Sequence, residues 1–329
     1  MEQTRIIELK VEKLNRYQSN DCTMVLPFSP KQSMSMKEMF LEHFNSFRKF
    51  SDACGEGVST FAVSEDGVVA QAFIAAKKDT VNSLIIGRHG MCELYLSGDP
   101  RISLRHLTLL LYPKSHGFRF RLLDLRSSLS FQNERGDLCK SVEADGPLFI
   151  RLGSYTLFFF PTKSDIFRRS NPRKAWDSIP RRLYDEQMFL PPTSPDNEDD
   201  EISSVFSLPP PRAITSCSLG DIVAEMELDC KSKKVVVSVD QASLETGILL
   251  GRYGRCDSVA SGILNVNYIS RVHLLLIMIA GEIYVIDTGS TNGCYYRDKR
   301  FTRLQMDNNR EITLGKSGKS PFYLRWKQV

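Results

Sequence analysis

The spacing of apolar residues changes character along the chain, and the first change comes near residue 56. Before that point, five apolar residues share one face of a helix: Met36, Met39, Phe40, Phe44 and Phe47. This pattern predicts a helix over about 36–52. We interpret its apolar stripe as a core-facing surface. Residues 1–55 therefore form an N-terminal extension that either caps the following domain or presents its helix to a partner.

Residues 56–161 and 213–329 carry a shorter, strand-like pattern. The first range contains runs such as VAQAFIAA, HLTLLLY, FRFRLLDL and TLFFFP, and the second contains KVVVSV, RVHLLLIMIA and EIYVID. Gly, Asp, Ser, Lys and Pro separate these runs. Many short strands at this spacing are typical of antiparallel β-sandwiches or barrels. The pattern predicts a mainly β protein with two such domains.

Residues 162–212 differ in composition from both flanking ranges. They begin with a basic part, continue with the acidic run DNEDDE at 196–201, and close with three prolines at 209–211. Such a composition predicts a charged, Pro-containing linker that is extended and partly disordered. Its charge blocks either solvate the chain or dock a partner.

The overall composition is that of an ordinary globular protein. The chain has 329 residues, 42% of them hydrophobic, and its 43 basic and 39 acidic residues leave a net charge of +4. This balance does not favour a protein that coats nucleic acid. The short basic stretch between Arg168 and Arg182 has few aromatic residues beside it for stacking on bases. We therefore expect no nucleic-acid partner.

The sequence favours a cytoplasmic location. Its N-terminus carries charges throughout and has no apolar core of a signal peptide. No apolar run approaches the roughly 18 residues that a membrane helix needs, so we expect no membrane insertion. The eight cysteines are dispersed, with no C-x-x-C pair, which favours reduced thiols and no zinc site.

An ordered signature occurs twice. Each copy has Gly-Arg after an apolar strand, then S-x-x-H before another strand, then an Asp that opens a turn. The glycines Gly87 and Gly251 are 164 residues apart, and the histidines His106 and His273 are 167 apart. Because the order and the spacing are both kept, the two β domains are interpreted as an internal repeat.

The signature resembles the forkhead-associated (FHA) domain. In the second copy, Gly251-Arg252, Ser270-Arg-Val-His273 and Thr291-Asn-Gly293 stand in the order of that family. The resemblance covers about 213–329 at every motif position and about 58–161 less completely. It implies FHA-like antiparallel β-sandwiches whose loops, gathered at one end, bind phosphothreonine peptides and catalyse no reaction.

The resemblance also implies roles for individual residues. A phosphothreonine carries close to two negative charges and three strong acceptor oxygens, which suit the fork geometry of arginine. The asparagine amide offers both a donor and an acceptor to a peptide main chain. The implied phosphopeptide contacts are Arg252, Ser270, Arg271, Thr291 and Asn292, and the implied structural residues are Gly251, His273 and Gly293.

The first copy departs from the family pattern. Its candidate phosphate-binding residues, which would form a weak second site, are Arg88, Ser103, Arg105 and Ser128. Aligning the two turns on their aspartates places Leu129 where Asn292 stands, and a leucine side chain cannot hold a peptide main chain. This copy therefore binds weakly, binds something else, or serves as a packing partner.

An enzymatic function is disfavoured. Ser270, His273 and Asp287 are the residue types of a hydrolase triad, but a spacing of three along a strand points the first two to opposite faces. The chain also lacks the P-loop, dinucleotide-binding and protein-kinase motifs. We expect no catalytic residue, no cofactor and no metal.

The leading hypothesis is a phosphothreonine-binding adaptor in Ser/Thr kinase signalling, with phosphothreonine-containing proteins and a Ser/Thr kinase as partners. Tandem FHA modules without an attached kinase resemble bacterial regulatory proteins. The alternative is a phosphate-independent scaffold or oligomerisation protein, and the oligomeric state stays open. Thr193, three residues before Asp196, is a candidate phosphorylation site that the second copy could bind.

Overall fold

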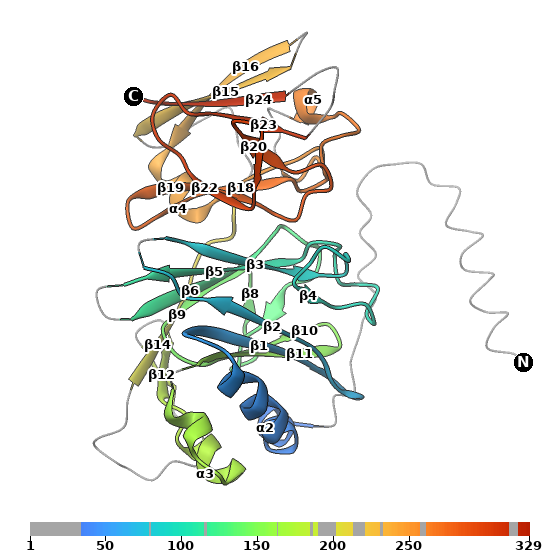
Figure 1. The fold of residues 1–329 in the computed structure, drawn as a ribbon, viewed down its shortest axis with the longest axis vertical. Helices are drawn as coiled ribbons and strands as arrows, with labels where there is room; N and C mark the ends of the chain where they lie inside the picture. The colour runs from blue at the N-terminus through green and yellow to red at the C-terminus, as the bar shows by residue number, and fades with distance from the viewer. Residues whose placement is uncertain are drawn as a thin grey trace, which may run out of the picture. The chain divides into compact units, whose positions relative to one another are not determined.

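The computed structural model describes residues 34–78, 80–114, 117–162, 164–184, 187–189, 202–212, 221–230, 233–256, 261–315 and 322–329. All of them belong to one compact unit, Gln32–Val329. Within it, the described strands form four sheets, accompanied by a few short helices and one longer one (Figure 1). This confirms the predicted mainly β fold. Thr193 and most of the N-terminal extension lie outside the described residues.

Two sheets enclose the first core. One has the order β2 (Gly67–Ala75), β1 (Gly57–Ser64), β11 (Tyr155–Pro161), β10 (Leu148–Leu152), β7 (Phe131–Gln132) and β8 (Leu138–Cys139). The other has the order β13 (Gln187–Phe189), β12 (Arg181–Tyr184), β14 (Ile202–Ser207), β9 (Ser141–Ala144), β6 (Phe118–Asp124), β5 (Leu107–Pro113), β3 (Asn82–Gly87) and β4 (Leu94–Tyr95). Apolar side chains from both sheets meet between them and form a β-sandwich.

Two further sheets enclose the second core. One has the order β16 (Lys233–Asp240), β15 (Ile222–Cys230), β24 (Phe322–Gln328), β23 (Glu311–Leu314), β20 (Cys294–Tyr296) and β21 (Lys299–Phe301). The other has the order β17 (Ile248–Leu250), β18 (Leu274–Ile279), β19 (Glu282–Asp287) and β22 (Arg303–Gln305). The short helices α4 (Gln241–Thr246) and α5 (Ser261–Leu264) connect strands here. The fully buried Trp326 belongs to the core of this sandwich.

The two sandwiches pack against each other through the β3–β5–β6 sheet and the β17–β18–β19 sheet (Figure 1). Side chains alternate across a strand, so Leu109 enters the first core while its neighbour Leu110 faces the second sandwich. Leu276 and Ile277 on β18 divide in the same way. Because β5 and β18 are buried on both faces, each has the continuous apolar sequence of a central strand.

Helix α2 (Met36–Ala53) covers the remaining face of the first sandwich, together with η1 (Asp165–Arg168) and α3 (Pro172–Asp177) (Figure 1). Ser35 and Glu38 form a capping box at its start, which satisfies free N–H groups of the first turn. The rings of Phe40, Phe44 and Phe47 are fully buried on this face. The predicted helix and its core-facing stripe are therefore confirmed.

The described part of residues 162–212 differs from the predicted linker. Strand β14 pairs in antiparallel fashion with β9, and β12 pairs in parallel with β14, so both extend a sheet of the first sandwich. Their alternating residues Tyr184 and Val205 enter its core. The linker prediction was wrong here because two four-to-six-residue alternating runs are hidden within a charged composition.

A buried ion pair fixes this segment to the sandwich. Arg182 and Glu134 bond to each other with almost no exposed surface. Burial raises the pKa of Glu134, and the charge of Arg182 opposes that rise. The guanidinium also lies 4.9 Å from the ring centre of Phe149. A basic residue that composition assigned to a solvated linker is thus part of the first sandwich.

None of the described helices has the length and apolar character needed to cross a membrane.

Candidate functional site

Three loops of the second sandwich meet at one end. Residues 251–256 follow β17, residues 265–273 precede β18, and residues 288–293 join β19 to β20. The amide of Arg252 donates to the carbonyl of Ser270 at 3.1 Å. The amide of Thr291 donates to the hydroxyl of Ser270 at 3.1 Å. These bonds bring together residues that the sequence separates by up to about 40 positions.

Gly251 lets two of these loops approach closely. A methyl group at its Cα would lie 2.2 Å from the carbonyl oxygen of Arg271, far inside van der Waals contact. Gly293 has a different requirement, since its φ of +78° favours glycine. Gly251 thus allows a close approach of two loops, and Gly293 allows a turn with a positive φ.

His273 joins two of the loops through its buried ring. Its Nδ1 accepts from the amide of Ser270 at 3.0 Å, so its Nε2 carries the proton and donates to the carbonyl of Gly293 at 3.2 Å. Burial lowers the pKa of His273 to about 4, with the charges of Arg105 and Arg300 acting in the same direction. The ring is therefore neutral and serves as a fixed connector.

The turn after β19 is held at several points. The amide of Ser290 donates to Oδ1 of Asp287 at 2.6 Å, and Nη2 of Arg300 donates to the carbonyl of Ser290 at 2.8 Å. Burial raises the pKa of Asp287. The side-chain amide of Asn292 donates to the carbonyl of Tyr268 at 2.8 Å. Asn292 thus anchors its own loop, using one of the two N–H groups that its amide offers.

Two arginines lie free at this end. Arg252 and Arg271 are exposed, and within the described part of the chain their guanidinium groups make no hydrogen bond or ion pair. Thr291 is also exposed, beside the nearly buried Ser270. Two uncompensated cations next to hydroxyl and amide groups form an arrangement that attracts a multiply charged anion.

The same loop framework recurs in the first sandwich. The amide of Arg88 donates to the carbonyl of Ser103 at 3.0 Å, as Arg252 does to Ser270. The amide of Ser103 donates to Nδ1 of His106 at 2.9 Å, as Ser270 does to His273. Two hydrogen bonds of the loop framework thus occur at corresponding positions of the repeated signature.

The residues predicted as a weak second site are arranged differently from those of the second sandwich. Nε of Arg88 donates to the carbonyl of Ile102 at 3.1 Å, and Leu129 packs against the first core. Arg105 is buried and donates to the carbonyl of Gly289, which belongs to the second sandwich. Ser128 alone stays exposed. The structure thus places Arg105 on a carbonyl of the second sandwich, and the repeat aligns Leu104, not Arg105, with Arg271.

Sequence reasoning missed two residues that shape the turn, Arg300 and Tyr268. Arg300 has a counterpart in the first copy, because Nζ of Lys140 donates to Oδ2 of Asp124 at 2.7 Å and to the carbonyl of Ser127 at 3.0 Å. A cation downstream of each repeat aspartate is the signal that could have found it. Tyr268 acts through its backbone carbonyl, which side-chain chemistry does not reveal.

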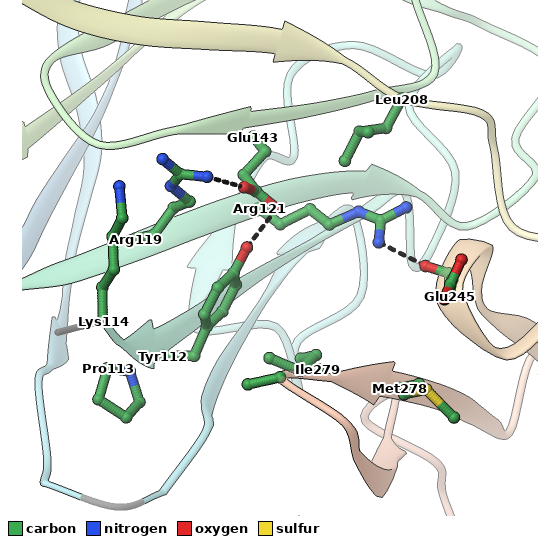
Figure 2. A pocket seen from close by; sticks show the side chains of 11 residues that line it. Tyr112, Pro113, Lys114, Arg119, Arg121, Glu143, Leu208, Glu245, Met278 and Ile279 are labelled. Carbon is green, nitrogen blue, oxygen red and sulfur yellow. Dashed lines mark hydrogen bonds and ion pairs between the residues drawn. The ribbon is translucent and has the colours of Figure 1, made fainter.

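A cavity of about 710 Å³ lies apart from these loops, where the ends of β5, β6 and β18 meet (Figure 2). Arg119 in its wall bonds Glu143 at 2.7 Å, and the hydroxyl of Tyr112 bonds the same carboxylate. Its charges are therefore largely paired. Among the described residues, no group of three or more metal-ligating side chains comes together. The loop end of the second sandwich is the better candidate site.

Comparisons with known proteins bear on the same region. The family model of the FHA domain matches residues 248–315, which contain all three loops of the second sandwich described above. No curated protein matches the chain.

Several solved structures resemble part of the chain. FHA-1 of Mycobacterium tuberculosis Rv1747 is 20% identical, with 32% of this chain and 98% of that chain covered and a TM-score of 0.25. The FHA domain of CT664 from Chlamydia trachomatis is 17% identical, with 32% and 98% covered and a TM-score of 0.25. The N-terminal FHA domain of S. cerevisiae Rad53p, solved with a phosphothreonine peptide, is 20% identical, with 33% and 94% covered and a TM-score of 0.27.

The match to the family model and the order of the loop motifs agree on one segment of the chain. One segment of the chain, residues 248–315, therefore matches the FHA domain family, and this segment contains the loops of the candidate site.

Proposed function

We propose that the protein is an adaptor that binds phosphothreonine peptides at the loop end of its second sandwich. The observation that carries this proposal is the exposed pair Arg252 and Arg271, unpaired within the described residues, beside Ser270 and Thr291. The three loops are already held by backbone bonds, so little ordering is needed when an anion binds. A phosphate group fits this donor set better than a carboxylate, because it offers three acceptor oxygens.

We propose distinct roles for the site residues. Arg252 and Arg271 supply the charge, and Ser270 and Thr291 supply short donors close to the phosphate. Asn292 has one N–H and its carbonyl oxygen left for the peptide main chain after its bond to Tyr268. Gly251, His273 and Gly293 hold the loops and do not touch the peptide.

The proposed activity is binding and not catalysis. His273 receives its hydrogen bond from the backbone amide of Ser270, while the hydroxyl of Ser270 accepts from Thr291. A nucleophile–base pair needs the hydroxyl itself to bond the imidazole. The geometry of Ser270 and His273 therefore argues against a nucleophile–base pair, and we propose a binding module for phosphoproteins made by a Ser/Thr kinase.

We further propose that the first sandwich is a degenerate FHA copy. It keeps the loop framework around His106, but the side chain of Arg88 bonds the carbonyl of Ile102 and Leu129 replaces the peptide-holding amide. Recognition then depends mainly on the second copy.

The test compares the matched arginines of the two copies in the full chain. Binding to a phosphothreonine peptide library, with phosphoserine and unphosphorylated libraries as controls, should be lost in Arg252→Ala. Charged hydrogen bonds contribute about 1.5–3 kcal/mol each, so a loss of roughly tenfold to a hundredfold or more in affinity is expected. Arg88→Ala should bind like the wild type.

If the Arg252→Ala protein keeps the wild-type affinity for phosphothreonine peptides, the proposal is overturned and a phosphate-independent scaffold is favoured. Equal losses in both variants would contradict the degenerate status of the first copy.

A further inference from the structure

We infer that Arg105 of the first sandwich is a positioning residue for the phosphopeptide turn of the second sandwich. The inference rests on the proposed function of that site. It assigns the first copy a task within the site, in place of a separate binding activity. The turn concerned is residues 288–293, which carries Thr291 and Asn292.

The geometry is a direct contact between the two sandwiches. Nε of Arg105 donates to the carbonyl of Gly289 at 2.8 Å, and Nη2 bonds the same oxygen. Arg105 has 8% of its surface exposed, so this bond forms away from solvent. Gly289 has a φ of +76° and lies two residues before Thr291. The carbonyl that starts the turn is thus held from the other sandwich.

The bond has the properties of a strong one. A charged donor bonding a carbonyl in a poorly solvated place contributes more than a neutral pair. Burial lowers the pKa of Arg105, and the nearby Asp287 charge acts in the opposite direction. Removing the guanidinium would leave the Gly289 carbonyl without this donor, and the turn would have to order itself on binding.

The contact has a counterpart in the opposite direction. Nη1 of Arg255, from the second sandwich, donates to the carbonyl of Arg126 at 3.2 Å. Arg126 has a φ of +57° and stands two residues after Asp124, as Gly289 stands two residues after Asp287. Each turn is therefore bonded by an arginine from the other copy. The two acceptor carbonyls are equivalent in the repeat, whereas the donors come from different loops, since the repeat aligns Arg105 with Val272 and not with Arg255.

The apolar surface between the copies follows the same relation. Leu110 and Leu123 of the first copy occupy the repeat positions of Ile277 and Ile286 in the second, and all four lie in the shared cluster. The two copies pack through equivalent faces. This packing places Arg105 at the turn of the second site. Because its guanidinium bonds Gly289 there, Arg105 is not available to bind a phosphate in the first sandwich.

The experiment removes the hydrogen-bond donors of Arg105. It compares the effect with that of the same substitution at another buried arginine that also bonds backbone of the second sandwich. Arg105→Met keeps the length of the side chain without its donors, and Arg105→Lys restores a charged donor. The matched control is Arg121→Met. Arg121 is also buried and also bonds backbone of the second sandwich, but at the carbonyl of Glu245 in α4, at 2.7 Å (Figure 2).

Two readouts are made on the full chain. The first is hydrogen exchange at the amides of Ser290 and Thr291 without peptide. The second is the dissociation constant for a phosphothreonine peptide selected by the wild type. Arg105→Met should speed exchange in the turn and weaken binding by about threefold to thirtyfold, the range of known coupling effects. Arg105→Lys should recover part of both, and Arg121→Met should change neither.

The outcomes separate this inference from the proposed function. Unchanged exchange and affinity in Arg105→Met overturn the positioning role while phosphopeptide binding stands. Equal changes in Arg121→Met also overturn it, because general loosening of the interface would then be the cause. If the wild type captures no phosphopeptide, the proposed function fails, and the exchange measurement alone decides whether Arg105 orders the turn.

Discussion

Individual side chains fix the loop ends of both sandwiches. Each histidine accepts a backbone amide on Nδ1 and donates from Nε2, His273 to Gly293 and His106 to the carbonyl of Leu129 at 2.8 Å. Burial lowers the pKa of both rings. A neutral tautomer with one donor and one acceptor is the form that such a connector requires.

The low pKa of His273 predicts that the stability of the protein depends on pH. The folded value is about 4 against 6.5 for the free side chain, so the unfolded state binds more protons between these values. The free energy of unfolding therefore falls as the pH drops from about 6.5 to 4, by up to on the order of 3 kcal/mol. Titration of the ring by NMR should give an apparent pKa near 4.

A variant isolates this contribution from the other titrating groups. His273→Gln should destabilise the protein more at pH 7.5 than at pH 5, because only the wild type loses stability through protonation of the ring. Urea unfolding at both pH values measures the difference. A ring that titrates near 6.5, or a variant with the same penalty at both pH values, would contradict the buried connector.

Gly251 gives a second prediction at this scale. Gly251→Ala places a methyl group 2.2 Å from a backbone oxygen that cannot rotate away, so it should destabilise the second sandwich by about 1–3 kcal/mol. Gly254→Ala is the matched control three residues away, where a methyl group meets nothing within 4 Å. Urea unfolding should separate the two, and equal stabilities would argue against close contact of the loops.

At the scale of elements, helix α2 and one face of the first sandwich form a further apolar cluster, separate from the cores of the two sandwiches. The ring of Phe47 lies 4.4 Å from that of Phe61 and 5.2 Å from that of Phe158, measured between ring centres. Trp176 of α3 reaches the same cluster and stacks on Phe149 at 5.6 Å. Helices from before and after the strands of the first sandwich therefore cover the same sheet.

This packing predicts a large cost for one truncation. Phe47→Ala removes a fully buried ring and should lower the free energy of unfolding by about 3–5 kcal/mol. Phe50→Ala, on the half-buried side of the same helix, should cost clearly less. Thermal and urea unfolding compare the two, and similar losses would mean that α2 does not form part of the core.

At the scale of the whole described unit, the interface between the sandwiches is both apolar and polar. The apolar cluster includes Leu110, Leu275 and Ile277, and at its edges Arg105 and Arg121 donate to carbonyls of the second sandwich. On this face, each β-sandwich has apolar side chains that the other sandwich covers. A domain cut at residue 213 would expose the β18 side chains that the first copy covers.

The interface predicts the behaviour of the second sandwich alone. Residues 213–329 expressed alone should self-associate, because the exposed patch matches an equivalent face on a second copy. Sedimentation velocity over a concentration series measures this. Leu275→Lys with Ile277→Lys should restore a monomer, whereas a wild-type fragment that stays monomeric at high concentration would refute the prediction.

The sequence by itself determined the local features of this protein. Periodicity located α2 and the strand-rich ranges, because helix and strand spacing is written in consecutive residues. The ordered motifs located the loops around Arg252, Ser270 and Thr291, because those residues lie next to strand ends. The sequence did not reveal β12 and β14, because their short alternation of apolar and polar residues lies within a charged segment.

Only the tertiary structure decided how these parts are combined. The bond from Arg105 to Gly289 joins residues 184 positions apart, and no local pattern distinguishes an arginine that binds phosphate from one that bonds a distant carbonyl. Strands β5 and β18 are apolar on both faces, so their sequence predicts that both faces are buried. It does not predict which surface covers each face. Pairing of surfaces depends on the geometry of the whole fold, and that geometry placed the first copy beside the site of the second.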